Sequence, residues 1–264
     1  MKVMSYNTLF AGYDNNNNRR FLGQLELITG INPDVLLVQE AKNLTSNGSI
    51  MQFEMEKRLN MRGFIAQAPH TGQNTGIFIK EGIQPIAAEV DSIHFHHAVM
   101  VLKVSIPTFD KPINFISAHL CPFGPHVRLR EVCYLTNYAV PNELTLLAGD
   151  FNAVSPYDPV PKGLDELPSH FQARYIEPDG AVNHSVMKTL YQAGFIDIAQ
   201  KLGKHHIPTV PSASFKGAEF VPFRSDYILT TLALSKYAQS YAVIKNDITD
   251  YASDHYPIIA EFSP

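Results

Sequence analysis

Side chains that can bind cations or carry protons follow short apolar runs at six places in this 264-residue chain. The runs are typical of buried β-strands, and each one ends at or adjoins a polar residue. Because the ends of neighbouring strands meet at one edge of a sheet, we expect these side chains to gather at one rim of the fold. They are Asn7, Glu40, His119, Asp150 and Asn152 in a GDFN segment, Asp226, and the Asp254–His255 pair.

Such a rim would suit the binding of a divalent cation. Carboxylates that converge repel one another unless a cation lies between them, and we expect one between Glu40 and the side of Asn7 and Asp254. Taken singly, each residue has an ordinary explanation, since an Asn or Asp at the end of a strand commonly forms a turn. Six such segments in one chain are poorly explained by coincidental turns, so the joint pattern favours a functional site.

The elements that must position these residues are mostly strands. Apolar runs predict strands at 2–9, 34–39, 75–80, 98–105, 113–119, 144–149, 226–230, 242–246 and 257–262. Apolar residues at helical spacing predict helices at 19–29, 49–61, 127–139 and 183–192. Many strands with four helices favour a sheet-rich α/β sandwich over a doubly wound parallel sheet.

Composition excludes several classes of protein. Lys and Arg total 21 and Asp and Glu total 25, which gives a formal net charge of −4, and 45% of the residues are hydrophobic. These values exclude a disordered chain, a coiled coil and a collagen-like fibre. A net acidic chain is also poorly suited to nonspecific nucleic-acid binding, because the neutralisation of phosphates needs surplus Lys and Arg.

No linker rich in Pro, Gly or Ser divides the chain, so we expect a single domain over residues 1–264. The Asn run at 15–18 and the Pro-rich segment 155–168 are expected to be surface loops. Cys121 and Cys133 are expected to be reduced and buried. The chain has no apolar run of membrane-spanning length and no signal-like start. We therefore expect a cytoplasmic monomer, with a secreted protein whose signal was removed as the alternative.

The ordered motifs resemble those of the endonuclease/exonuclease/phosphatase superfamily, which has the deoxyribonuclease I-like fold. The matching segments are SYN, QE, AHL, GDFN, RSDYIL and SDHYPI, of which GDFN and SDH are the most specific. They extend over essentially the whole chain. The resemblance implies an α+β four-layer α/β/β/α sandwich, in which two packed mixed β-sheets are flanked by helices and the site lies at one end of the sheets.

The resemblance also implies a phosphoric ester hydrolase that uses Mg²⁺ or Mn²⁺. The residue types agree with this chemistry, because hard oxygen ligands suit Mg²⁺ and a divalent ion neutralises phosphate charge. Cysteine is absent from the motifs, which argues against a structural zinc site. Glu40 is expected to be the principal metal ligand, and the full expected set is Asn7, Glu40, Asp150 and Asp254.

The catalytic roles that the resemblance implies fall on five residues. Asp150 serves as a metal ligand or as the base for the attacking water, and Asn152 donates hydrogen bonds to the scissile phosphate. Asp226 orients His255, which contacts the phosphoryl group, as a paired carboxylate fixes the tautomer of an imidazole. His119 corresponds to the second histidine of the deoxyribonuclease and sphingomyelinase branches.

Two positions depart from the family pattern. The deoxyribonuclease branch carries a Glu that pairs with the histidine of the AHL motif, and the corresponding segment here offers Gln73 and Asn74. Many members have an Arg where this chain has His96 and His97. His94 and His96 on one face of a strand would suit zinc, but the Asp-His of a metallo-β-lactamase pattern does not follow. We expect instead a histidine-rich rim near the phosphate.

Residues beside the motifs are candidates for contacts with a substrate. Arg128 and Arg130 lie two positions apart on a predicted helix and cannot share a face, so one is expected to reach the site and the other solvent. Tyr13, Phe123 and Tyr157 lie in loops that follow motif strands and could line a cleft.

The substrate that we expect is a small phosphoester, such as a headgroup, a sugar phosphate or a nucleotide. The acidic net charge and the lack of a long Lys/Arg-rich insertion disfavour duplex DNA. The loops after Asn7 and Asn152 are expected to enclose a pocket of the corresponding size. The alternatives are an endonuclease or exonuclease acting on DNA or RNA, and a catalytically inactive binding module. The last is disfavoured because every expected catalytic position holds a competent residue.

Overall fold

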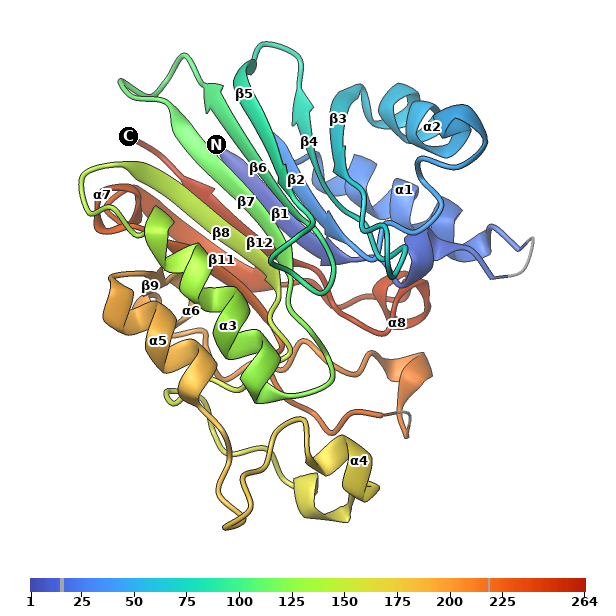
Figure 1. Cartoon of the computed structure of the whole chain (residues 1–264). Helices are drawn as coiled ribbons and strands as arrows, with labels where there is room; N and C mark the ends of the chain where they lie inside the picture. The colour runs from blue at the N-terminus through green and yellow to red at the C-terminus, as the bar shows by residue number, and fades with distance from the viewer. Residues whose placement is uncertain (15–16, 218) are drawn as a thin grey trace.

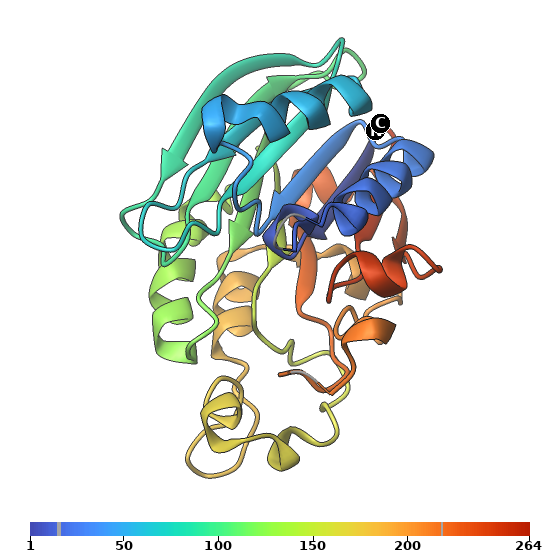
Figure 2. The ribbon, with the colours of Figure 1, turned by 90° about the vertical axis from the view of Figure 1, so that its right-hand side faces the viewer.

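Two six-stranded sheets pack face to face in the computed structural model, which describes residues 1–14, 17–217 and 219–264 (Figures 1 and 2). The strand order of the first sheet is β11 (Ala238–Val243), β12 (Ile258–Phe262), β1 (Lys2–Asn7), β2 (Val35–Gln39), β4 (Thr75–Lys80) and β3 (Met61–Ala66). The strand order of the second is β5 (Gln84–Asp91), β6 (Val99–Ser105), β7 (Ile113–His119), β8 (Leu144–Asp150), β10 (Asp226–Thr230) and β9 (Ile196–Asp197).

Helices cover the outer face of each sheet, so the expected four layers are confirmed (Figure 1). The first sheet packs against α1 (Arg19–Ile31) and α2 (Ile50–Leu59), and the second against α3 (Pro125–Leu135) and α5 (Ser185–Ala193). Four short helices lie in the connections: α4 (Ser169–Gln172), α6 (Ile198–Lys201), α7 (Leu232–Ser235) and α8 (Thr249–Ala252). Within the described ranges, no helix is long and apolar enough to cross a membrane.

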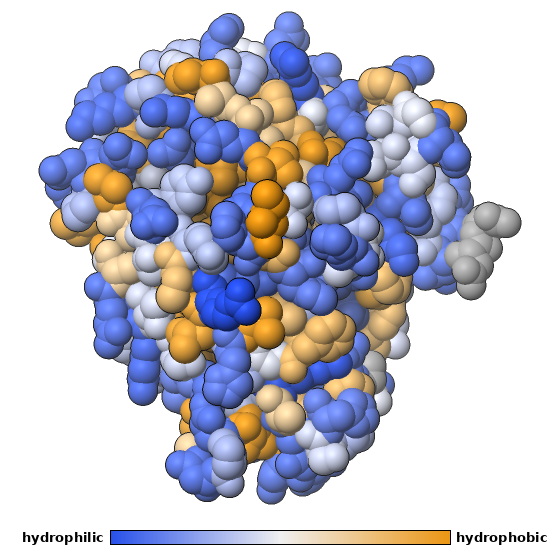
Figure 3. All heavy atoms as spheres, viewed as in Figure 1, coloured by the Kyte–Doolittle hydropathy of each residue, from blue (hydrophilic) through white to orange (hydrophobic). Residues whose placement is uncertain are grey.

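The continuous apolar run of β2 follows from this layering. Val35 and Leu37 face the core between the sheets, whereas Leu36 and Val38 face the core beneath the helices, because successive side chains of a strand point to opposite faces. The two termini lie side by side, since the N-terminal ammonium of Met1 donates to Phe262 O at 2.7 Å (Figure 2). On the face shown in Figure 3, apolar side chains lie in small groups among polar ones.

Strand register brings the motif residues together at one end of both sheets. In the second sheet, His119 lies opposite Asp150 across the parallel β7–β8 pair, and Asp226 lies opposite Asp150 across the antiparallel β8–β10 pair. In the first sheet, Asn7 lies opposite Gln39 across the parallel β1–β2 pair, so Glu40 follows one residue later. The pairing alone therefore places three motif segments side by side in the second sheet and two in the first.

Several elements differ from the sequence-based expectation. Strands β3, β5 and β9 were not predicted, and β11 begins and ends earlier than the strand expected at 242–246. The edge strand β5 is exposed along nearly its whole length, so its sequence carries no pattern of burial. Cys121 is buried as expected, but Cys133 is exposed, because α3 turns Arg128 and Glu131 inward instead. Of the predicted Asn-rich loop, Asn15 and Asn16 lie outside the described residues.

The close approach of β7 to β8 depends on Gly149, which generates a prediction. Its φ is +147°, and a Cβ added there would lie 1.8 Å from the carbonyl oxygen of Ala118. We expect Gly149→Ala to destabilise the fold by about 3 kcal/mol or more, which lowers Tm by roughly 6–12 °C in a thermal melt. Gly30→Ala is the control, since nothing lies within 4 Å of its added Cβ, and its Tm should hold or rise slightly. Equal melting of the two variants would contradict the steric account.

Candidate active site

The eight predicted site residues form one connected group beside a cleft of about 420 Å³. Asn7 and Asp226 lie behind the wall of the cleft and bond to residues that form it. The other six line the cleft: Glu40, His119, Asp150, Asn152, Asp254 and His255. The structure therefore brings all eight predicted residues together, and the contacts described next bear on the role that each could have.

Asp150 is the centre of the group, with only 2% of its surface exposed. Its Oδ1 accepts hydrogen bonds from Ser225 Oγ at 2.6 Å and from the backbone N–H of Asn152 at 2.9 Å. Its Oδ2 accepts one from Asn7 Nδ2 at 3.1 Å. Burial by itself would raise the pKa of this carboxyl, but the positive charge of His255 and these donors hold it below its usual value. Asp150 is therefore an ionised carboxylate at neutral pH.

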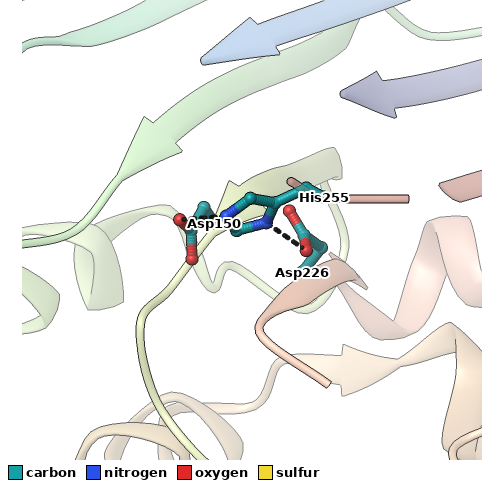
Figure 4. Close-up of side chains that lie close together, drawn as sticks. All are labelled: Asp150, Asp226 and His255. Atoms are coloured by element: carbon teal, nitrogen blue, oxygen red, sulfur yellow. Dashed lines mark hydrogen bonds and ion pairs between the residues drawn. The ribbon is translucent and has the colours of Figure 1, made fainter. Parts of the chain in front are cut away.

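His255 is held between carboxylates, as the close-up shows (Figure 4). Its Nδ1 is 2.9 Å from Asp226 Oδ2, and its Nε2 is 3.6 Å from Asp150 Oδ2 and 4.0 Å from Asp254 Oδ1. Burial would lower the pKa of this histidine, but the charges of Asp226, Asp150 and Asp254 raise it well above the usual value. His255 is therefore an imidazolium. Its Nε2 faces Asp150 and Asp254, which line the cleft.

Glu40 is a half-buried carboxylate with weak partners. It accepts hydrogen bonds from Asn7 Nδ2 at 3.2 Å and from Gln73 Nε2 at 3.4 Å. Burial, followed by the nearby charge of Asp254, raises the pKa of Glu40 to about 7. Burial also raises the pKa of Asp254. The charge of His255, whose Nε2 lies 4.0 Å from Asp254 Oδ1, lowers both pKa values but does not offset the effect of burial.

Backbone strain gathers at the same end of the sheets. Glu40 and Asn152 have φ values of +51° and +48°, and Leu9 and Phe10, which also line the cleft, have +45° and +59°. Residues other than glycine adopt this left-handed region at an energetic cost, and they persist there mostly where function requires a particular side-chain position. Strand ends that turn in this way point the Glu40 and Asn152 side chains back toward the site.

His119 is supported by another ring rather than by a carboxylate of the kind found in the deoxyribonuclease branch. Its Nε2 lies 3.4 Å from Asp150 Oδ2, and its ring stacks on His97 with centroids 4.3 Å apart and planes 24° apart. His97 in turn has Nδ1 2.9 Å from Thr71 Oγ1. Burial lowers the pKa of His119 to about 4 and that of His97 to about 2, so both rings are neutral at pH 7.

Gln73 and Asn74 occupy the segment where the deoxyribonuclease branch carries the Glu that pairs with the AHL histidine, and both have other hydrogen-bond partners. Gln73 donates to Glu40, and Asn74 is a structural residue whose side chain accepts from Ala68 N and donates to Ala41 O. The expected histidine-rich rim is present, since His96 and His97 line the cleft. The zinc alternative is wrong, because residues 92–97 do not form a strand and His94 bonds to Asp91 at 2.8 Å.

Some neighbouring residues were misplaced by the sequence-based expectation. Phe123 lines the cleft, but Tyr13 packs on Phe21 and Tyr157 on Tyr191. The Pro-rich segment 155–168 does not enclose the cleft either. Residues 158–162 instead line a separate cavity of about 300 Å³, because the segment is drawn away from the site by a buried ion pair between Asp158 and Arg224.

Arg128 was expected either to reach the site or to point to solvent, and it does neither directly. It is buried and donates to the backbone carbonyls of Cys121 and Arg174, while Arg130 is exposed as expected. The sequence also gave no signal for three further residues of the cleft wall, because they lie in irregular loops outside any motif. They are Arg174, Glu219 and Phe220.

The charged groups that line the cleft are mostly acidic. Glu40, Asp150, Asp254 and Glu219 lie on its wall together with a single arginine, Arg174, which pairs with Glu219. Without a bound cation, such a cleft repels the negative charge of a phosphate. The distribution of charge therefore calls for a cation at the carboxylates with raised pKa values rather than for a long basic groove.

A model of the Endonuclease/Exonuclease/phosphatase family matches residues 4–255, so the chain belongs to this family. A search of curated proteins by sequence finds no match. Among solved structures, TDP2 of D. rerio complexed with single-strand DNA product aligns with a TM-score of 0.70 at 18% identity, over 100% of this chain and 99% of that one. The family and the fold define a phosphoesterase of the deoxyribonuclease I-like class.

Two other solved structures also align with nearly the whole chain. An AP endonuclease from Archaeoglobus fulgidus aligns with a TM-score of 0.72 at 19% identity, over 99% of both chains. The human Nocturnin catalytic domain with bound sulfate aligns with a TM-score of 0.67 at 16% identity, over 100% of this chain and 93% of that one. At these identities the likeness supports the shared fold.

Proposed function

We propose that this protein is a divalent-metal-dependent phosphoesterase that hydrolyses a small phosphoester. The observation that carries the proposal is that a protonated histidine and carboxylates with raised pKa values line the same cleft. His255 supplies a positive donor, while Glu40 and Asp254 form an acidic site beside it. We further propose that residues 1–264 form one domain. The monomeric state and the cytoplasmic location remain predictions.

The residues present fit a hard divalent cation. Glu40 and Asp254 are half-buried carboxylates whose pKa values are raised by burial, and Asp150 adds carboxylate oxygens next to them. Asn7 turns its Nδ2 toward Glu40 and Asp150 here, and it would offer its amide oxygen to an ion with the amide reversed. Mg²⁺ and Mn²⁺ prefer such ligands. These four residues would hold the ion. When bound, it neutralises phosphate charge and polarises a phosphoryl oxygen.

A second grouping also lies close enough to hold an ion but fits one poorly. Donor atoms of Asp150, Asp226 and His255 lie within 4.8 Å of one another. Nδ1 of the histidine is already bonded to Asp226, and its raised pKa means that the ring is protonated. A protonated imidazole has no lone pair for a metal. This trio is better suited to proton and hydrogen-bond chemistry.

The protein side chains would then act on the phosphoester as follows. The Nε2–H of His255 donates to a phosphoryl oxygen, and Asp226 holds the ring in that orientation. Asp150, which stays ionised, orients the attacking water by accepting its hydrogen bond. Asn152 supplies an amide donor to the phosphate, and Asp150, with the neutral His119 3.4 Å from its Oδ2, is the base that takes the proton from the water.

A small substrate is favoured by the size and charge of the cleft. Its volume of about 420 Å³ is in the range of small-molecule sites, and its acidic wall is unsuited to a polyanion. A nuclease is the second candidate, and it is favoured by the fold neighbours, one of which is complexed with single-strand DNA and another of which is an AP endonuclease.

A substrate panel tests the proposal. We expect the purified protein with Mg²⁺ or Mn²⁺ to hydrolyse at least one small phosphomonoester or diester with a higher kcat/KM than supercoiled plasmid, single-stranded oligonucleotide or RNA. His255→Ala should abolish each genuine activity and so exclude contamination. Plasmid cleavage far faster than that of every small substrate would instead establish the nuclease.

Glu40 generates a prediction about metal binding. A cation at 100 times its Kd should stabilise the wild type by about 2.7 kcal/mol, which raises Tm by roughly 5–11 °C, and Glu40→Gln should lose most of this rise together with turnover. The exposed Glu81→Gln is the matched control and should keep both. Full metal-dependent turnover in Glu40→Gln would refute the assignment.

The same glutamate predicts a pH effect in the metal-free protein. Its pKa is raised from 4.5 to about 7, so folding favours the protonated form and stability falls as pH rises between these values. Glu40→Gln removes this cost. Metal-free Glu40→Gln should therefore melt at or above the wild type at pH 8, in a thermal melt monitored by circular dichroism.

Asp226 and His255 are predicted to act as a unit. Replacing either by Ala should lower kcat by roughly 10²-fold or more, because each substitution removes the oriented positive donor. The double variant should lose little beyond the worse single variant. A double loss equal to the product of two large single losses would show that the two residues act independently.

A further inference from the structure

Phe123 is an exposed aromatic side chain on the wall of the cleft. It follows β7 in the loop that leads to α3, and 66% of its surface is exposed. His96, from the segment between β5 and β6, meets it edge to face, with ring centroids 5.1 Å apart and planes 80° apart. An edge-to-face contact supports one side of the Phe123 ring and leaves ring surface open to the cleft.

The two segments that carry these rings are tied together by a buried carboxylate. Glu131 on α3 is 1% exposed, and its Oε1 accepts a hydrogen bond from the backbone N–H of His96 at 2.7 Å. Its Oε2 accepts one from the backbone N–H of Cys121 at 2.8 Å. Arg128 on the same helix donates to the carbonyl of Cys121 at 2.9 Å. Two buried charged side chains thus fix the loop that carries Phe123, so this wall is preorganised.

The aromatic wall is continuous with the catalytic residues. His96 contacts His97 edge to face at 4.7 Å, His97 stacks on His119 at 4.3 Å, and His119 lies 3.4 Å from Asp150. A ligand that spans from Asp150 to Phe123 would therefore pass beside this row of rings, of which Phe123 and His96 are the more exposed. The phosphoester chemistry lies at one end of this row, and an open phenyl ring lies at the other.

The wall suits a flat, unsaturated ring better than an alkyl chain. His96 adds a neutral imidazole, because burial lowers its pKa, and a neutral imidazole offers one hydrogen-bond donor and one acceptor. An alkyl chain against it would cover these groups without replacing their hydrogen bonds. A nucleobase has both a flat face for Phe123 and polar edge groups for His96.

We propose that His96 and Phe123 form a subsite for the nucleobase of a small nucleotide, which specifies the substrate class of the active site. The inference rests on the proposed phosphoesterase function for the position of the phosphate. Phe123 supplies the stacking surface, His96 contacts the polar edge of the base, and Glu131 is a positioning residue that holds both segments. The cleft of about 420 Å³ accommodates one nucleotide.

Calorimetric titration tests this subsite without turnover. AMP and ribose 5-phosphate share the phosphate and the sugar and differ only in the base. In a His255→Ala background with Mg²⁺, we expect AMP to bind about tenfold more tightly than ribose 5-phosphate, and Phe123→Ala to remove that preference. Phe123→Trp should keep it. Phe53→Ala is the control, since Phe53 is 60% exposed on α2 away from the cleft and should leave the ratio unchanged.

Two results would overturn the subsite: equal affinity of the His255→Ala protein for AMP and ribose 5-phosphate, or an equal loss for both ligands when Phe123→Ala is added to it. Octyl phosphate provides the alkyl comparison, and a Phe123-dependent preference for it over AMP would also contradict the proposal. A failure of the proposed function would be seen separately, as absence of hydrolysis of any phosphoester by the protein with His255 intact.

Discussion

The ionised carboxylate of Asp150 is held from both sheets at once, and the arrangement of the site follows from that constraint. Asn7 from the first sheet donates to it, as does Ser225, which directly precedes β10 of the second. His255 approaches from the connection that leads into β12. A buried charge is tolerated only where donors and opposite charge surround it, so the ends of the two sheets must meet in one relative position. The fold and the site are therefore stabilised by the same contacts.

Charge in the site is divided into two halves with different needs. Around Asp150 and Asp226 the negative charge is partly offset within the protein, because His255 is an imidazolium held between them. Around Glu40 and Asp254 it is not balanced, and burial raises the pKa of both carboxyls. The first half is complete in the protein alone, while the second half fits a cation. This asymmetry explains how an acidic protein can bind a negatively charged phosphoester.

Much of the fold and nearly all of the central site could be predicted from the sequence, because the signals were local. Strands such as 113–119 and 226–230 are rich in apolar residues, and motif residues stand at the strand ends. Strand β5 was not predicted because both its faces are exposed, so its sequence shows no pattern of burial. Arg174 and Phe220 were missed because irregular loops bring them to the cleft, and the course of such loops depends on contacts distant in sequence, such as that of Asp158 with Arg224.

The distinct protonation states of the two histidines are the most direct test of this account. In the metal-free protein, NMR titration of the imidazole resonances should show His255 titrating above the ordinary value of 6.5, because three carboxylates surround it. His119 should titrate well below that value, at about 4, because it is buried and stacked on a neutral ring. A His255 that loses its proton at or below 6.5, or a His119 that remains charged there, would contradict the charge balance on which the proposed chemistry depends.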